Sequence, residues 1–133
     1  MAARKRSDAG IELSEAEWKV MRCLWRASPA TARDVLDALR GETRWAYTTV
    51  KTVLARLEAK GAVAAEMRGN TSWYAPRVAQ GEARSRAVRG LVDRAFEGAF
   101  GSLFHYLADP KTLSKKERAE LRRALGDAEQ ERP

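Results

Sequence analysis

The chain has 133 residues, 44% of them hydrophobic and 32% charged, which is typical of a globular domain rather than of a disordered or membrane-spanning chain. This length fits one domain, or a small domain with an appendage, and excludes a large enzyme core. The net charge of +7 indicates an anionic partner such as nucleic acid, and most of the excess lies in residues 1–77, with 14 basic and 9 acidic side chains. No apolar run could form a membrane span or the core of a secretory signal, so we expect a cytoplasmic protein without membrane insertion.

The first predicted helix begins after Ser14. The Ser14 hydroxyl can accept a hydrogen bond from the amide of Glu17 while the Glu17 carboxylate reaches back, which is a capping box. Apolar residues with helical period follow, including Trp18 and Trp25, which we expect in the core. Pro29 ends this segment.

The second predicted helix is short. Thr31 is its expected N-cap, Asp34 lies in its first turn, and Gly41 is expected to end it. The apolar residues that it should bury are Val35, Leu36 and Leu39.

The third predicted helix lies within "RWAYTTVKTVLARLEAKG", residues 44–61, from about Ala46 to a left-handed Gly61. Its apolar stripe has the spacing i, i+3, i+4 and i+7 and consists of Val50, Val53, Leu54 and Leu57. The opposite face is slim and bears hydroxyl groups: Thr48, Thr52, Ala55 and Ala59, flanked by Lys51 and Arg56.

A β-hairpin follows, because residues 62–67 and 72–76 flank the turn sequence "RGNT". Trp73 and Tyr74 are neighbours in the second strand, so one should be buried and the other partly exposed. Three helices followed by a hairpin are the order of a winged helix-turn-helix. The predicted fold is therefore mainly α with a small β-hairpin, in which residues 1–10 are a basic tail and residues 11–77 are the DNA-binding domain.

Residues 78–133 form a predicted helical dimerisation region. Apolar residues spaced three and four apart predict one long amphipathic helix from about Val88 to Pro110, and Ser114 with Glu117 caps a last helix. Gly90, Gly98 and Gly101 indicate either a close helix approach or a break. So many apolar side chains must be buried against another surface, which is either a second copy of the chain or the chain's own winged domain. The expected dimerisation residues are Leu91, Val92, Phe96, Phe100, Leu103, Phe104, Leu107, Leu121 and Leu125.

The segments "LSEAEWKVMRCLW", "WAYTTVKTVLARLEAKG" and "TSWYAP", in this order, resemble the penicillinase repressor (BlaI/MecI) family of winged-helix regulators. The resemblance implies a homodimeric transcriptional repressor that binds a two-fold-related operator. It also implies a membrane-bound sensor metalloprotease as partner and inactivation by cleavage in the C-terminal region. Family members that control β-lactamases are cut at an Asn-Phe bond, and the matching position here reads His105-Tyr106.

The slim face of the third helix is suited to the major groove, where short side chains let the helix approach the base edges. The hairpin tip and the start of the helix add groups for the phosphate backbone. The candidate DNA-binding residues are Arg44, Thr48, Thr49, Lys51, Thr52, Arg56, Arg68 and Asn70. The alternatives are a plain solvated face, a winged-helix protein-interaction module, and a non-specific architectural DNA binder.

An enzyme is the least favoured class. The chain has one cysteine, Cys23, and one histidine, His105, and lacks a Gly-rich phosphate loop. A disulfide within the chain and a metal site built on several Cys or His residues are therefore excluded. We expect no catalytic site and no cofactor.

Overall fold

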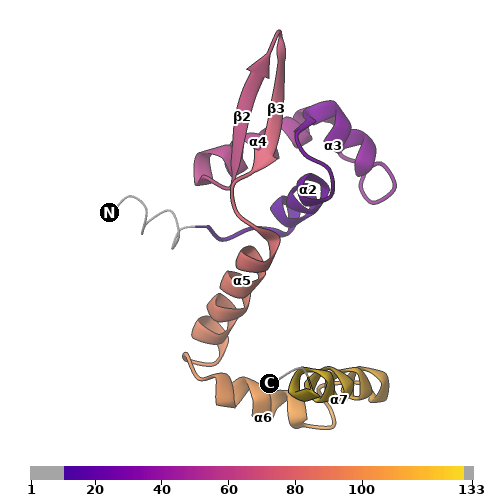
Figure 1. Cartoon of the computed structure of the whole chain (residues 1–133), viewed down its shortest axis with the longest axis vertical. Coiled ribbons are helices and arrows are strands. Elements are labelled where there is room, and N and C mark those ends of the chain that lie inside the picture. Colours follow the sequence, from indigo (N-terminus) through magenta and orange to yellow (C-terminus); the bar gives the residue numbers. More distant parts are fainter. Residues whose placement is uncertain (1–10, 131–133) are drawn as a thin grey trace. The chain divides into compact units, whose positions relative to one another are not determined.

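The computed structural model describes residues 11–130, which divide into two compact units, residues 11–87 and 88–130 (Figure 1). The N-terminal unit contains α2 (Glu15–Arg26), β1 (Ala30–Thr31), α3 (Ala32–Ala38), α4 (Tyr47–Lys60), β2 (Val63–Arg68) and β3 (Thr71–Pro76). Helix α5 (Gln80–Ala95) begins in this unit and ends in the C-terminal one, which also holds α6 (Phe100–Ala108) and α7 (Lys115–Gln130). The predicted fold class is confirmed. The expected basic tail, residues 1–10, lies outside the described residues.

The predicted starts of α2 and α3 are confirmed by two complete capping boxes. In α2 the Glu17 amide donates to Ser14 Oγ at 3.2 Å and the Ser14 amide donates to Glu17 Oε1 at 2.7 Å. In α3 Thr31 and Asp34 exchange the same pair of bonds, at 3.1 and 3.0 Å. Each box satisfies amides that the first turn would otherwise leave without partners, so it fixes where the helix begins.

The predicted end of α3 at Gly41 is wrong. The helix ends at Ala38, with Leu39 as its C-cap. The Arg40 amide then donates to Asp37 O at 3.3 Å, and the amides of Glu42 and Thr43 both donate to Leu39 O at 2.9 Å, which are turn bonds rather than helical ones. The chain thus leaves the helix before it reaches the glycine.

The predicted hairpin is confirmed, and it belongs to a three-stranded antiparallel sheet with the strand order β1-β3-β2. Gly69 occupies the tight turn with φ 64°, a conformation that glycine adopts without steric cost. The two-residue strand β1 was not predicted, because so short a strand has no pattern of its own. It pairs Ala30 with Tyr74 and Thr31 with Trp73, and this joins the start of α3 to the hairpin.

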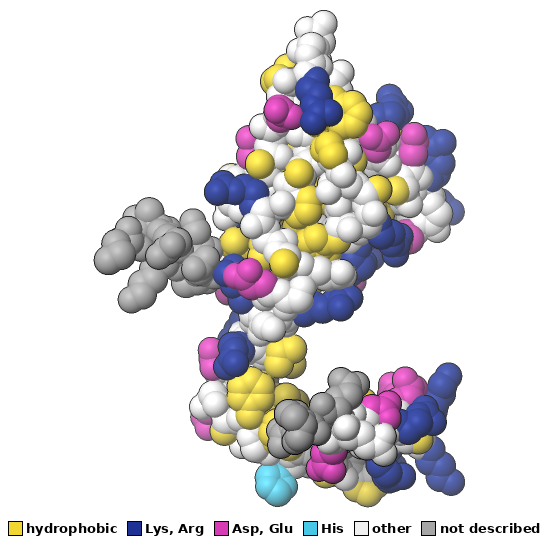
Figure 2. All heavy atoms as spheres, viewed as in Figure 1, with side chains coloured by type: hydrophobic (Ala, Val, Ile, Leu, Met, Phe, Trp, Pro, Cys, Tyr) yellow, Lys and Arg dark blue, Asp and Glu magenta, His cyan; other side chains and the backbone are white. Residues whose placement is uncertain are grey.

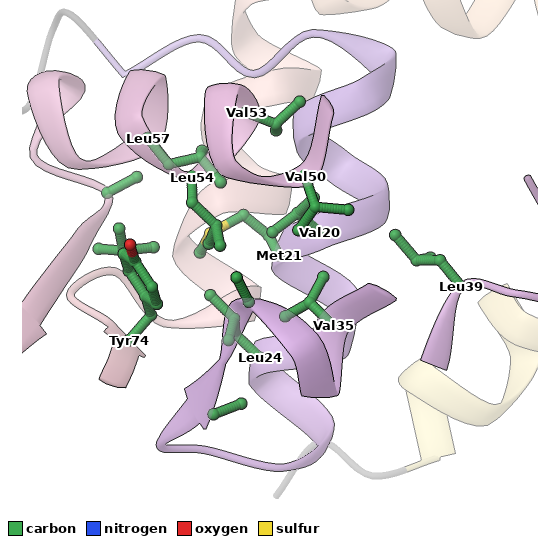
Figure 3. Packing of buried hydrophobic residues seen from close by; sticks show 14 of the residues in the cluster. Val20, Met21, Leu24, Val35, Leu39, Val50, Val53, Leu54, Leu57 and Tyr74 are labelled. Atoms are coloured by element: carbon green, nitrogen blue, oxygen red, sulfur yellow. The ribbon is translucent and has the colours of Figure 1, made fainter. Parts of the chain in front are cut away.

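The core of the N-terminal unit lies between α2, α3, α4 and the sheet (Figure 3). Leu54 of α4 points toward Met21 of α2 at its centre, and both are fully buried. Trp25 lies at its edge, 5.9 Å from the Trp18 ring centroid, and its indole N–H donates to Val78 O at 2.9 Å. Val78 itself is buried in the same core. The compact unit therefore extends past residue 77.

The prediction of one long helix from Val88 to Pro110 is wrong, because the chain breaks between α5 and α6. Glu97 has φ 52° and Gly98 has φ 82°, and the Gly98 amide donates to Val92 O at 3.0 Å. This left-handed pair ends α5 in the manner of a glycine C-cap. Of the two meanings left open for the glycines, Gly98 marks a break. Among the helices within residues 11–130, none combines the length with the low charge that a bilayer crossing demands.

Candidate nucleic-acid interface

Helix α4 presents one buried and one exposed face. Its predicted apolar stripe is confirmed: Val50, Val53, Leu54 and Leu57 are at most 3% exposed. The predicted opposite face is exposed along its full length and consists of Thr48, Lys51, Thr52, Ala55, Arg56 and Ala59. Because the buried stripe packs on α2 and α3, this slim basic face points away from the core.

Among residues 11–130, no side chain caps the first backbone donors of α4. Its N-cap, Ala46, has no side chain that can cap, and the first turn contains no acidic residue. The helix dipole and the uncapped amides favour an anion at such an end. Arg44 and Thr49 are exposed on either side of it. Residues Leu36, Arg40, Thr43, Arg44 and Trp45 line a half-open hollow of about 310 Å³ just before this helix.

The threonine hydroxyls of α4 differ in what they can offer a base. Thr52 Oγ1 donates to Thr48 O at 3.0 Å, so its proton is used within the helix and its oxygen remains as an acceptor. Within residues 11–130, the hydroxyls of Thr48 and Thr49 make no hydrogen bond. These two can donate or accept at a base edge or a phosphate.

The hairpin places the predicted wing residues at its tip. Asn70 is exposed in the turn, and Arg68 lies at the end of β2. Arg68 Nε donates to Glu66 Oε1 at 3.1 Å, and its guanidinium lies 5.2 Å from the centroid of the Trp73 ring. The Glu66 pair is exposed on both sides, so it contributes little and can exchange for a phosphate.

The sequence did not predict an ion pair that ties α4 to α2. Lys60 Nζ, at the end of α4, lies 2.6 Å from Glu17 Oε1 and 2.6 Å from the carbonyl oxygen of Glu12. Glu17 is only 2% exposed. Burial alone would raise the pKa of the Glu17 carboxyl, but hydrogen bonds from Lys60 and Ser14 outweigh it and hold that pKa below its ordinary value. The Glu17 carboxylate is therefore ionised at neutral pH, and its contact with Lys60 holds the end of α4 in place.

Two exposed side chains near the start of α4 were also missed. The guanidinium of Arg33 in α3 lies over the ring of Tyr47, the first residue of α4, with the guanidinium carbon 5.1 Å from the ring centroid. A cation–π contact between two helices leaves no signal in either helix pattern. The only signal in the sequence that could have indicated a role for Arg33 is its basic charge.

The C-terminal unit buries little. Val92 is its only buried residue between residues 88 and 130, and α6 and α7 bury none. Of the predicted dimerisation residues, Leu91, Phe104, Leu121 and Leu125 are 37 to 61% exposed, and Phe96, Phe100, Leu103 and Leu107 are half-buried. Figure 2 shows hydrophobic side chains reaching the surface of this unit.

Two ring contacts connect α6 to α5 and to the segment that follows it, and a third lies within α6. The rings of Phe96 and Tyr106 lie 5.8 Å apart, centroid to centroid. Phe100 contacts Phe104 at 6.2 Å, and the guanidinium of Arg89 lies 5.7 Å from the Phe100 centroid. These contacts hold α6 against the end of α5 and leave the outer sides of the rings uncovered.

The described residues offer no arrangement for nucleophilic or metal chemistry. Burial, and then the charge of Glu42, raise the pKa of the Cys23 thiol, so it is protonated at neutral pH. Residues 11–130 contain no cluster of three or more His, Cys, Asp or Glu that could hold a metal ion. What the surface offers is a set of charges and hydrogen-bonding groups around α4.

Comparison with known proteins gives a family for the chain. The family model described as penicillinase repressor matches residues 13–127. The chain is 26% identical to the methicillin resistance regulatory protein MecI of Staphylococcus aureus strain N315, over 86% of this chain and 93% of that protein. It is also 26% identical to the penicillinase repressor of Bacillus licheniformis, over 86% of this chain and 89% of that one.

A solved structure is similar over about half of the chain. The solution structure of monomeric BlaI from Bacillus licheniformis in complex with the blaP half-operator is 29% identical to the chain. The match covers 55% of this chain and 89% of that one, with a TM-score of 0.48.

Proposed function

The chain belongs to the penicillinase repressor family, and from this premise we propose that it is a homodimeric transcriptional repressor that binds a pseudo-palindromic operator. The family match agrees with the prediction that the chain is not an enzyme. As a repressor it acts in the cytoplasm, on double-stranded DNA.

The exposed face of α4 carries the proposal. The major groove of B-DNA is about 12 Å wide and admits one helix, provided that the side chains toward the bases are short. Thr48, Thr52 and Ala55 meet this condition, and Lys51 beside them can reach guanine or a phosphate. We assign base contacts to Thr48, Thr52 and Lys51.

Backbone contacts surround this reading face. We assign phosphate contacts to Arg44 and Thr49 at the start of α4, to Arg56 farther along it, and to Arg68 and Asn70 at the wing. All five are exposed. Such contacts set the register of the protein on the duplex and carry no sequence information of their own.

The C-terminal unit supplies the dimer. With one buried side chain among residues 88–130, this unit cannot be stabilised by its own core, since each fully buried Leu or Phe contributes about 1.5 to 3 kcal/mol. A second copy presents the same apolar surface, so that pairing of the two copies buries both surfaces at once. Leu91, Phe104, Leu121 and Leu125 are the most exposed predicted contacts, while Val92 is covered within the chain.

Regulation by cleavage in the C-terminal region, with a membrane-bound sensor metalloprotease as partner, is an expectation from the family. His105 and Tyr106 are exposed, but both lie within α6. Cleavage there would first require α6 to open locally, because a protease acts on an opened segment of chain.

Selection of bound duplexes from a random pool, followed by footprinting, tests the proposal. We expect an inverted repeat whose half-sites are centred about 10 base pairs apart, or a multiple of this. Protection of a single half-site would contradict the dimer. Binding of all duplexes alike would favour an architectural protein, and no binding near 50 mM salt would favour a protein-interaction module.

A further inference from the structure

Arg33 is an exposed guanidinium held in place by a ring from the next helix. Its guanidinium carbon lies 5.1 Å from the Tyr47 centroid, within the range of a cation–π contact, and Tyr47 is itself 41% exposed. Within residues 11–130, Arg33 has no carboxylate partner, whereas Arg40, which lies just after the end of α3, is paired with Asp37 at 2.9 Å. The charge of Arg33 is therefore available to an outside anion.

The cation–π contact prepares this guanidinium for a phosphate. An arginine that lies over an aromatic face keeps its N–H donors at the edge of the plane, where they can bond a phosphate in bidentate geometry. The Tyr47 ring also restricts the side-chain rotamers of Arg33 before binding. Less conformational entropy is then lost when the contact forms.

The position of the pair fits the DNA backbone. Arg33 is the second residue of α3 and Tyr47 is the first residue of α4, so the pair lies at the N-terminal end of α4, where the helix dipole favours an anion. The Asp34 carboxylate, next to Arg33, accepts the Thr31 amide at 3.0 Å as part of the cap. In a helix-turn-helix, the helix before the recognition helix crosses the backbone at the groove edge.

We propose that Arg33, held by Tyr47, contacts a DNA phosphate and thereby fixes the angle at which α4 enters the major groove. This rests on the proposed function and adds to it a contact from α3. Tyr47 acts as a positioning residue, through its ring rather than through its hydroxyl.

The test measures the affinity of the full chain for a random duplex of about 30 base pairs, roughly three helical turns, over a range of salt concentrations. The variants are Arg33→Gln, Tyr47→Phe and Tyr47→Ala. The matched control is Arg22→Gln, because Arg22 is exposed on α2 and lies opposite to that helix's buried residues.

Arg33→Gln should weaken binding roughly tenfold and reduce the slope of log K against log salt by about 0.9 for each protomer. Tyr47→Phe should bind like the unaltered chain, because the ring is retained. Tyr47→Ala should weaken binding less than Arg33→Gln does, and should add nothing to it in the double variant.

Two outcomes separate the possible failures. If Arg33→Gln and Arg22→Gln leave the same slope, Arg33 contacts no phosphate and this inference is wrong while the proposed function stands. If the unaltered chain shows no salt-dependent binding, the proposed function itself is wrong. A loss with Tyr47→Phe as large as with Tyr47→Ala would also overturn the role assigned to the ring.

Discussion

Lys60 at the end of α4 and Glu17 in the first turn of α2 are joined by a 2.6 Å ion pair across 43 residues of sequence. The pair lies at the far end of α4 from the Arg33–Tyr47 contact. Helix α4 is thus tied to its neighbours at both ends. Its orientation is set by polar contacts in addition to its buried stripe.

Lys60→Met should destabilise the N-terminal unit by about 2 kcal/mol, because it leaves the buried Glu17 carboxylate without its cation. Lys60 is itself 33% exposed, so the cost is below that of a fully buried pair. All four tryptophans lie within residues 11–87, and their fluorescence during urea unfolding reports on this unit alone. Arg40→Met is the control, since it breaks an exposed pair and should cost less than about 0.5 kcal/mol. An equal loss of stability in Lys60→Met and Arg40→Met would show that the burial of Glu17 does not add to the cost of breaking its ion pair.

The lowered pKa of the Glu17 carboxyl predicts that the stability of the N-terminal unit depends on pH. A group whose pKa is lower in the folded state stabilises the fold above its unfolded pKa, and this contribution is lost as pH falls through the folded value. The free energy of unfolding should therefore decrease as the pH is lowered below about 4. In the Glu17→Gln variant this free energy should decrease less steeply over the same range. The measurement is urea unfolding followed by tryptophan fluorescence in acidic buffers. Parallel curves for both proteins would rule out Glu17 as the titrating group.

Thr48→Ala and Arg68→Ala should weaken DNA binding in different ways. Thr48 faces the bases in our proposal, so its loss should change the preference at one position by on the order of 1 kcal/mol. Arg68 contacts the backbone, so its loss should weaken binding to all sequences and reduce the salt slope by about 0.9 per protomer. Binding to a panel of single-base operator variants at several salt concentrations distinguishes the two. If both variants lost the same affinity for every DNA sequence in the panel, the result would argue for an architectural binder.

Phe104→Glu should shift the chain from dimer to monomer at micromolar concentration, because it introduces a charge into a side chain that is 60% exposed on the apolar face of α6. Ser102→Glu is the control, since Ser102 is exposed elsewhere on the same helix. Sedimentation velocity measures both. A monomeric unaltered chain, or equal effects of the two variants, would contradict the proposed interface.

Gly98→Ala and Gly101→Ala should have opposite effects. Gly98 has φ 82°, so an alanine there is strained and should cost about 1 kcal/mol. Gly101 lies in α6, where an added Cβ would meet no side chain and no other segment of the chain within 4 Å, so alanine there should gain up to about 1 kcal/mol in helix propensity. Thermal unfolding followed by far-UV circular dichroism measures both. A gain from Gly98→Ala would mean that the break is not required.

Local features of the fold could be predicted because their signals lie within a few residues. The capping boxes at Ser14 and Thr31, the stripe of α4 and the turn at Gly69 are of this kind. The helix break at Gly98 was visible only as one of two possibilities, since a glycine alone does not reveal its φ.

Contacts between distant segments could not be predicted. Strand β1 exists only because β3 pairs with it, and the Glu17–Lys60 pair needs two helices to meet. For the candidate interface, the face of α4 follows from helical period, whereas the contact of Arg33 with Tyr47 depends on how α3 packs against α4.

The near absence of buried side chains between residues 88 and 130 has a consequence for gene control. If that part of the chain gains its core by pairing, operator occupancy depends on the square of the free protomer concentration until pairing is complete. A modest drop in the cellular concentration of the repressor then lowers operator occupancy by more than the same proportion. The uncovered hydrophobic surface would thus set the dose at which repression gives way.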